Sequence, residues 1–155
     1  MNDVNVRLVE MGIELPPVNA PAAAYVPYVQ AGSLVFLSGH LARDKGALIT
    51  GRLGQDLTVQ QGQNAAHQIA IDLLATLQAA VGNLNRVKRL IKVTSFVAST
   101  PEFTEQHVVT NGCSNLLRDV FGERGIHSRS ACGVNQLPLG ACMEIELIAE
   151  VDALS

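Results

Sequence analysis

Apolar residues recur every three or four positions after Thr58, which is the spacing of one buried helix face. Thr58 and Gln61 have the capping-box spacing that starts a helix, and Gly82 stands where a left-handed cap would end it. The pattern therefore predicts a long helix between Thr58 and Gly82. Its apolar face would consist of Val59, Ala66, Ile69, Ala70, Leu73, Leu74, Leu77, Ala80 and Val81.

A second helical pattern follows and predicts a helix that starts at Thr100 and Pro101. Proline suits the first helical turn, because the amide donor that it lacks is not needed there. Gly122 or Gly125 would end this helix. The predicted buried stripe comprises Val109, Cys113, Leu116, Leu117, Val120 and Phe121.

Short runs of apolar and β-branched residues predict the strands. Residues 25–30 and 33–38 are two such runs, and the intervening Ala31 and Gly32 suit a two-residue hairpin turn. Residues 87–98 form a longer run and are the best candidate for a central strand.

The last quarter of the chain, from His127 to Val151, has the pattern of a further hairpin. Residues 128–136 and 141–153 are the predicted strands, and residues 137–140 form the turn between them. We expect this hairpin to close one edge of the sheet.

The N-terminal segment has a helix of its own. Val4, Leu8 and Met11 stand at helical spacing, and Gly12 would end that helix. The prolines that follow forbid regular structure, so residues 19–24 are predicted to form an extended connector to the sheet.

A loop rich in glycine and polar residues is predicted over residues 39–55. Its turn signal is Asp44, Lys45 and Gly46, and a short edge strand is expected at residues 47–50.

Taken in chain order, these elements predict an α+β fold with a mixed six-stranded sheet and two long helices packed on one face. The chain would be a single domain, residues 1–155, in which residues 1–18 add an N-terminal helix and connector. Alternate strand residues on the other face remain fairly apolar, so we expect that face to pack against other copies of the chain.

Composition favours one soluble domain, because 48% of the 155 residues are hydrophobic and 16% are charged. No apolar run reaches the roughly 20 residues that span a bilayer, and residues 1–10 do not have the pattern of a signal peptide. We therefore expect a cytoplasmic protein with no membrane partner. A net charge of -3 lacks the basic footprint of a nucleic-acid-binding protein, so nucleic acid is not an expected partner.

No cofactor or metal site is expected. The three cysteines, Cys113, Cys132 and Cys142, are odd in number and widely spaced, which argues against both a disulfide framework and a thiolate metal site. No two of the four histidines stand four residues apart. Phosphate-binding glycine loops and a nucleophile elbow are also absent from the sequence.

Arg129 is the candidate for chemistry that strand alternation reveals. Its side chain would share a face with Ala131, Gly133 and Asn135, which are small enough to leave room for a planar group. A guanidinium can bind a carboxylate through two parallel hydrogen bonds. Glu144 would lie on the neighbouring strand, where it either balances Arg129 or orients a water. From the pattern alone, an interface or surface ion pair is the favoured explanation of both residues.

A set of short motifs resembles the Rid (YjgF) family of reactive-intermediate deaminases. The motifs are residues 19–30 followed by Ser38 and Gly39, then residues 128–130, then Leu137 and Pro138, and finally residues 143–146. The resemblance implies a chorismate-mutase-like fold, a homotrimer with pockets between subunits, and no cofactor. It also implies cytoplasmic hydrolysis of enamines and imines, such as 2-aminoacrylate and its 2-imino acid tautomer, to 2-keto acids and ammonia.

The same resemblance implies roles for individual residues. Arg129 would bind the substrate carboxylate, and Glu144 would position the attacking water. The substrate-binding residues would be Tyr28, Ser38, Gly39, Asn111, Ser130 and Ala131. Ala131 stands where many family members have cysteine, and His40 stands where glutamine is common.

Two other functions stay open at this stage. A module that binds a small carboxylate or keto acid without turnover would use the same arginine. Ribonuclease activity, which the wider family is named for, is less favoured. Two tyrosines, four phenylalanines and no tryptophan give little surface for stacking bases.

Overall fold

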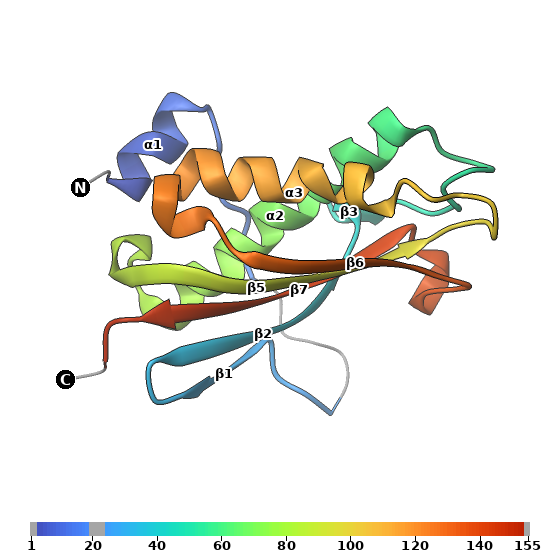
Figure 1. The fold of residues 1–155 in the computed structure, drawn as a ribbon. Coiled ribbons are helices and arrows are strands. Elements are labelled where there is room, and N and C mark those ends of the chain that lie inside the picture. The colour runs from blue at the N-terminus through green and yellow to red at the C-terminus, as the bar shows by residue number, and fades with distance from the viewer. Residues whose placement is uncertain (1–2, 19–23, 154–155) are drawn as a thin grey trace.

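The computed structural model describes residues 3–18 and 24–153. Helices α2 and α3 lie side by side on one face of a five-stranded sheet, and α1 packs near α3 (Figure 1). This is the α+β arrangement that the order of elements predicts. The helices are α1 (Val4–Glu10), α2 (Val59–Val81) and α3 (Gln106–Phe121), with short 3-10 segments at Leu84–Arg86, Gly122–Gly125 and Pro138–Gly140. The strands are β1 (Tyr28–Ala31), β2 (Leu34–Leu41), β3 (Arg43–Asp44), β4 (Ala47–Leu48), β5 (Val87–Ala98), β6 (Ser128–Val134) and β7 (Met143–Val151).

The order of strands in the sheet is β1-β2-β7-β5-β6, and β5 and β6 run parallel. The predicted pairing of residues 128–136 with residues 141–153 as a hairpin is wrong, because β5 lies between β6 and β7. Helix α3 connects β5 to β6, and a helical crossover of this kind joins parallel strands in one sheet. The chain then passes the end of β5 and inserts β7 between β2 and β5. β7 is therefore the central strand, and β6 alone closes that edge.

The main sheet has five strands rather than the predicted six. β3 and β4 pair only with each other in the described part of the chain, around the predicted turn at Asp44, Lys45 and Gly46. Lys45 and Gly46 both have positive φ, of 50° and 83°, as a tight hairpin of this kind requires. β2 itself extends to Leu41, three residues into the region predicted as a loop.

The first hairpin is shifted relative to the prediction. Its turn is Gly32 and Ser33, because Ala31 pairs with Leu34. β1 begins at Tyr28 and not at residue 25, since Pro27 has no amide hydrogen with which to extend the ladder. Its carbonyl oxygen still accepts a hydrogen bond from the amide of Ser38 at 2.9 Å.

Helix α2 has the predicted ends. The capping box of Thr58 and Gln61 is present, and Gly82 caps the C-terminus with φ of 79°. Helix α3 packs closely against α2 at Gly112, where an added Cβ would overlap the backbone of Gln63. The close approach of two backbones therefore requires glycine at this position.

The predicted start of α3 at Thr100 and Pro101 is wrong, and the helix begins at Gln106. Thr100 donates its amide to the carbonyl oxygen of Leu53, and its own carbonyl oxygen accepts from the amide of Phe103 at 3.1 Å, so residues 100–103 form a turn that does not continue into the helix. Phe103 then packs against the core before the helix starts. The predicted apolar stripe is confirmed as buried: Val109, Cys113, Leu116, Leu117, Val120 and Phe121.

The N-terminal helix is confirmed, with Val4 and Leu8 buried and Gly12 at φ of 67° after its end. Of the predicted connector at residues 19–24, only Ala24 lies within the described residues. No helix in residues 3–18 and 24–153 is long and apolar enough to cross a membrane.

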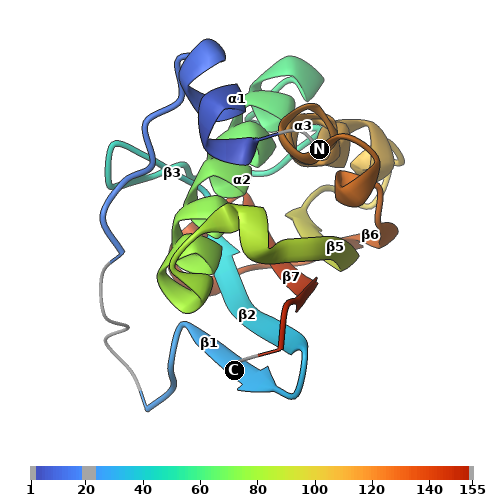
Figure 2. The same ribbon diagram turned by 90° about the vertical axis from the view of Figure 1, so that its left-hand side faces the viewer.

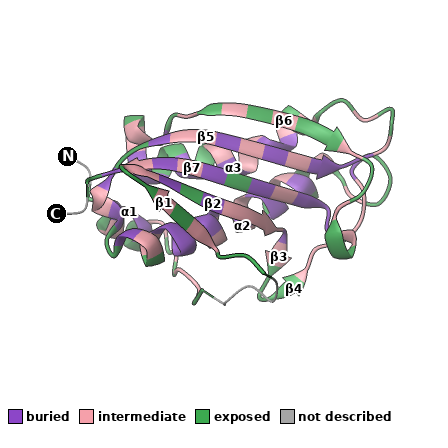
Figure 3. Cartoon of the chain, turned by 90° about the horizontal axis from the view of Figure 1, so that it is seen from below, coloured by how far each residue is buried: buried purple, intermediate pink, exposed green. Residues whose placement is uncertain are grey.

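The core lies between the sheet and the helical layer (Figure 2). Residues Met143, Ile145, Leu147, Ala149 and Val151 of β7 are buried on this side. In the described part of the chain no helix covers the other face of the sheet, and its exposed residues are visible from below (Figure 3). On this open face Val29 is 56% exposed and Phe36 is 41% exposed. Contact of this face with further copies of the chain stays a prediction.

Candidate functional site

A β-bulge in β2 contains two of the predicted site residues, Ser38 and Gly39. Leu37 pairs with Leu147 and His40 pairs with Ile145, so Ser38 and Gly39 together face the single residue Glu146. The Ser38 hydroxyl donates to the carbonyl oxygen of Val26 at 2.6 Å, which fixes its side chain.

Glu144 lies directly against this bulge. A Cβ added to Gly39 would overlap the Glu144 carboxyl group, so only glycine leaves space for that side chain. Glu144 is half-buried, and burial raises its pKa above the ordinary value, with the nearby Glu146 carboxylate raising it further. The structure thus places a carboxyl group of raised pKa beside Ser38 and Gly39.

Arg129 is fixed by neutral acceptors on and near α3. Its Nη1 donates to Oδ1 of Asn111 at 2.8 Å and to Oγ of Ser114 at 3.1 Å. Its Nη2 donates to the carbonyl oxygen of His107 at 3.2 Å. The structure therefore brings together Arg129 and Asn111, two of the residues that the resemblance names.

The charge of Arg129 has no acidic counterpart within the described residues. The two ion pairs found there join Arg7 to Glu10 and Arg118 to Asp119. The three contacts of Arg129 use three of its five N–H donors and leave Nε–H and one N–H on Nη2. Adjacent donors on a guanidinium are suited to an incoming carboxylate.

His127 is linked to Arg129 through the hydroxyl of Ser114. Its Nδ1 lies 2.7 Å from the carbonyl oxygen of Gly125, and a carbonyl only accepts, so Nδ1 carries the proton. In the neutral ring Nε2 is then an acceptor, and the hydroxyl of Ser114 donates to it at 2.9 Å. Burial lowers the pKa of His127, the Gly125 hydrogen bond opposes this to a smaller extent, and the charge of Arg129 adds a still smaller lowering.

The two predicted catalytic residues point to opposite faces of the sheet. Arg129 lies beside Val93 of β5, and Glu144 lies beside Phe96 of the same strand. Val93 and Phe96 are three residues apart in a regular stretch, so their side chains point to opposite faces. Arg129 therefore faces the helical layer with Asn111, and Glu144 lies on the open face with Ser38 and Gly39. The prediction that Glu144 belongs to the strand beside Arg129 is wrong.

The remaining predicted site residues lie on both faces of the sheet. Ala131 lies beside the buried Ser95 on the helical side, as Arg129 does. Ser130 lies beside Thr94, which also neighbours Glu146, so Ser130 belongs to the open face. Tyr28 pairs with Leu37, the residue before Ser38, and its side chain packs against the core rather than on the face of Glu144.

Sequence reasoning missed Ser114, His107 and the role of His127. Asn111 and Ser114 are three residues apart in α3, so they lie on one helix face. That spacing was a usable signal for Ser114. The contribution of His107 is a backbone carbonyl oxygen, which no side-chain pattern can reveal.

The three cysteines differ in their exposure to solvent. Cys113 is buried, and burial raises its pKa to about 12, so it stays a thiol. Cys142 is also buried and Cys132 is exposed, and all three are free thiols. In the described residues no three histidine, cysteine or acidic side chains are grouped so that they could hold a metal ion.

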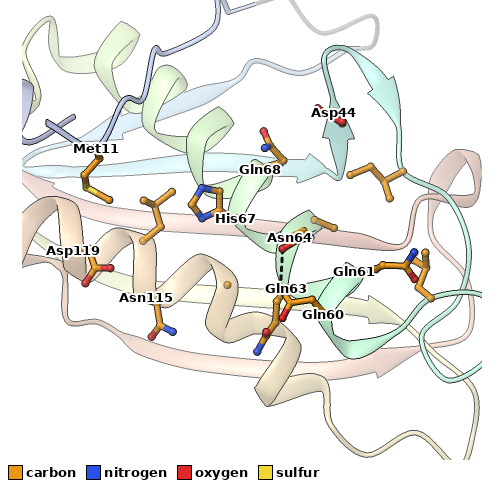
Figure 4. A pocket seen from close by; sticks show the side chains of 15 residues that line it. Met11, Asp44, Gln60, Gln61, Gln63, Asn64, His67, Gln68, Asn115 and Asp119 are labelled. Atoms are coloured by element: carbon orange, nitrogen blue, oxygen red, sulfur yellow. Dashed lines mark hydrogen bonds between the residues drawn. The ribbon is translucent and has the colours of Figure 1, made fainter. Parts of the chain in front are cut away.

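A polar groove of about 760 Å³ lies elsewhere, along α2 and α3 (Figure 4). Many of its side chains are amides, including Gln60, Asn64, Gln68 and Asn115, and His67 stands among them. Gln60 donates to Asn64 within it at 3.0 Å. None of the predicted site residues lines this groove.

Comparisons with known proteins agree with this fold. Residues 5–151 match the family described as YjgF/chorismate mutase-like, putative endoribonuclease. Protein TCP17 of Trypanosoma cruzi is 47% identical over 151 residues, which are 96% of this chain and 94% of that protein. The crystal structure of Atu1372 from Agrobacterium tumefaciens, a protein of unknown function, is 44% identical with a TM-score of 0.89, over 96% of this chain and 93% of that one. A putative endoribonuclease from Shewanella oneidensis is 34% identical with a TM-score of 0.93, over 97% of this chain and all of that one.

Proposed function

Because the chain belongs to the YjgF (Rid) family, we propose that it hydrolyses reactive 2-imino acids, and the enamines that interconvert with them, to 2-keto acids and ammonia. The reaction is proposed to need no cofactor. An imine carbon is already electrophilic, so the protein has to hold the substrate, place a water and assist proton transfer.

The state of Arg129 is the observation that carries this proposal. An arginine held by Asn111, Ser114 and the backbone of His107, with no acidic partner among the described residues, has a positive charge that is available to an anion. Its two uncommitted N–H groups would bind the carboxylate that every 2-imino acid carries. Ala131, on the same face of β6, leaves space beside the guanidinium.

Glu144 would act as the general base for the attacking water. On a protonated imine, the ionised carboxylate would accept a proton from the water as the new C–O bond forms, which leaves a neutral carbinolamine. It would return that proton to the amino nitrogen and then take the hydroxyl proton as the C–N bond breaks and the keto group forms. That last proton leaves with ammonia as ammonium, so the carboxylate is regenerated. A carboxyl group whose pKa is raised by burial and by Glu146 is suited to these transfers.

The proposed pocket takes Arg129 from one protomer and Glu144 from another. The two side chains point to opposite faces of one sheet, so a single chain does not bring them to one substrate. A homotrimer with head-to-tail contacts would form three equivalent pockets, each with residues from two protomers. The uncovered face of the sheet, with Val29 and Phe36 exposed, supports such an assembly.

Ammonia release from a freshly generated 2-imino acid tests the proposal. An amino acid oxidase would supply 2-iminopropanoate, and pyruvate and ammonia would be followed with and without this protein. We expect both to appear faster than in the uncatalysed reaction. Binding of pyruvate without faster ammonia release would instead indicate a carboxylate-binding module.

A further inference from the structure

The hydroxyl of Ser114 has an unusual set of contacts for a helical serine. Serine and threonine in helices often donate to the carbonyl oxygen four residues earlier. Thr110, one turn earlier in α3, shows this pattern and donates to the carbonyl oxygen of Gln106 at 2.8 Å. Ser114 instead lies 2.9 Å from Nε2 of His127 and 3.1 Å from Nη1 of Arg129.

These contacts form one directed chain of hydrogen bonds. The carbonyl oxygen of Gly125 fixes the proton of His127 on Nδ1, so Nε2 is left as an acceptor. The single hydroxyl proton of Ser114 then points to Nε2. A lone pair of Ser114 is consequently directed at Nη1 of Arg129, which can only donate.

We propose that Ser114 and His127 are positioning residues that set the orientation of the Arg129 guanidinium before an anion binds. A free hydroxyl rotates, and in some orientations it would present its proton to the guanidinium and repel it. The acceptor on His127 removes those orientations. Together with Asn111, Ser114 occupies both hydrogens of Nη1, so Nε–H and the remaining N–H of Nη2 are kept for the ligand.

This positioning lowers the cost of binding. An arginine side chain has many rotamers, and fixing them in advance reduces the entropy that a ligand must remove. The nature of the ligand, a small carboxylate, rests on the proposed function. The orientation of Arg129 does not, because the contacts that set it lie within one chain.

The experiment compares four variants of the full chain. Ser114→Ala removes the lone pair, and His127→Leu removes the acceptor that orients it. His127→Gln restores an acceptor, because the glutamine side-chain oxygen can reach the position of Nε2 and accept from the Ser114 hydroxyl. Thr110→Val is the matched control, since Thr110 is a helical hydroxyl that bonds Ser95 and Gln106 and does not touch Arg129.

Two measurements are made on each variant. The first is the dissociation constant of pyruvate by calorimetry. The second is the ¹⁵N–¹H signal of Arg129 Nε, whose exchange with water reports how firmly the guanidinium is held, together with the ring ¹⁵N shifts of His127. A purely structural role would not predict that glutamine restores what leucine removes.

We expect Ser114→Ala and His127→Leu to weaken pyruvate binding about tenfold, as the loss of one charge-assisted hydrogen bond implies. His127→Gln should bind within about threefold of wild type, and Thr110→Val should bind as wild type does. The Nε proton of Arg129 should exchange with water faster in Ser114→Ala and His127→Leu only. Wild-type behaviour of Ser114→Ala, equal losses in His127→Gln and His127→Leu, or ring shifts that place the proton on Nε2 would each overturn the inference.

Failure of the proposed function would look different. If the wild-type chain bound no pyruvate and released no ammonia, imine hydrolysis would be excluded. The Arg129 signal would then decide the positioning role alone: faster exchange in Ser114→Ala and His127→Leu would support it, and unchanged exchange would overturn it.

Discussion

Arg129 and Glu144 point to opposite faces of the same sheet, through the pairing of Val93 with Arg129 and of Phe96 with Glu144 on β5. Each lies in a prepared environment: Arg129 among neutral acceptors of α3, and Glu144 against Gly39 in the bulge of β2. These two environments would be the two halves of the proposed pocket shared between protomers.

Replacement of Arg129 by alanine should lower kcat/KM for imine hydrolysis by about 100-fold or more, because the charge-assisted contacts to the substrate carboxylate are lost. Arg129→Lys should also fail, since an ammonium group is a point donor and not a fork. Steady-state ammonia release measures both. Arg118→Ala is the control, because Arg118 is an exposed arginine on α3 that pairs with Asp119. Wild-type turnover by Arg129→Ala would contradict the assignment.

The neutrality of Asn111 should matter as much as its hydrogen bond. Asn111→Asp would place a carboxylate about 2.8 Å from Nη1 and neutralise the arginine in the free protein. We expect a higher Tm than wild type together with weaker pyruvate binding, by about tenfold. Asn111→Ala, which removes the contact without adding charge, is the companion variant and should lower Tm. Tighter pyruvate binding by Asn111→Asp would show that the ligand does not use the charge of Arg129.

Gly39→Ala should impair the reaction through Glu144. The added methyl group would occupy the space of the Glu144 carboxyl, and a flexible side chain can move away at small cost to stability. We therefore expect kcat to fall while the unfolding midpoint changes little. Gly39→Ala should add almost nothing in a Glu144→Gln background, since the two changes act on one group. Full additivity of the two losses in kcat would contradict this explanation.

The pH dependence of the reaction should report the pair Glu144 and Glu146. Burial, and to a smaller extent the charge of Glu146, raises the pKa of Glu144. As the pH falls, Glu144 should therefore become protonated at a higher pH than an ordinary glutamate does, and activity should be lost with its ionised form. Glu146→Gln removes one of the two causes and should move the acid limb of kcat to lower pH. Glu150→Gln, farther along the same strand, is the control and should leave the limb in place. A limb that moves to higher pH in Glu146→Gln would contradict the assignment to Glu144.

Local patterns predicted the positions of most helices and strands, but they did not predict which strands pair in the sheet. The capping box at Thr58 and the β-branched run at residues 87–98 identified α2 and β5, because both signals act within the segment itself. The start of α3 could not be read in this way, since a backbone contact between Thr100 and Leu53 overrides the proline signal. The false hairpin of residues 128–153 has a similar cause, because sequence adjacency does not show that β5 lies between two strands.

The site was predicted by resemblance in its residues and not in its geometry. The resemblance named Asn111 and Arg129 without placing them relative to each other, and the structure joins them by a hydrogen bond. The opposite orientation of Glu144 depends on the strand order, which the pattern of the last quarter did not contain. The His127 tautomer depends on a backbone carbonyl and needs coordinates.

Mixing two inactive variants tests the shared pocket most directly. Arg129→Ala and Glu144→Gln chains would be co-expressed with different tags, and assemblies that contain both would be isolated by tandem purification. In a mixed trimer with pockets between neighbours, one pocket of the three combines an intact Arg129 with an intact Glu144. The mixed assemblies should therefore recover about one third of wild-type ammonia release, whereas each variant alone stays inactive. Mixed assemblies with no more activity than the separate variants would contradict a site shared between protomers.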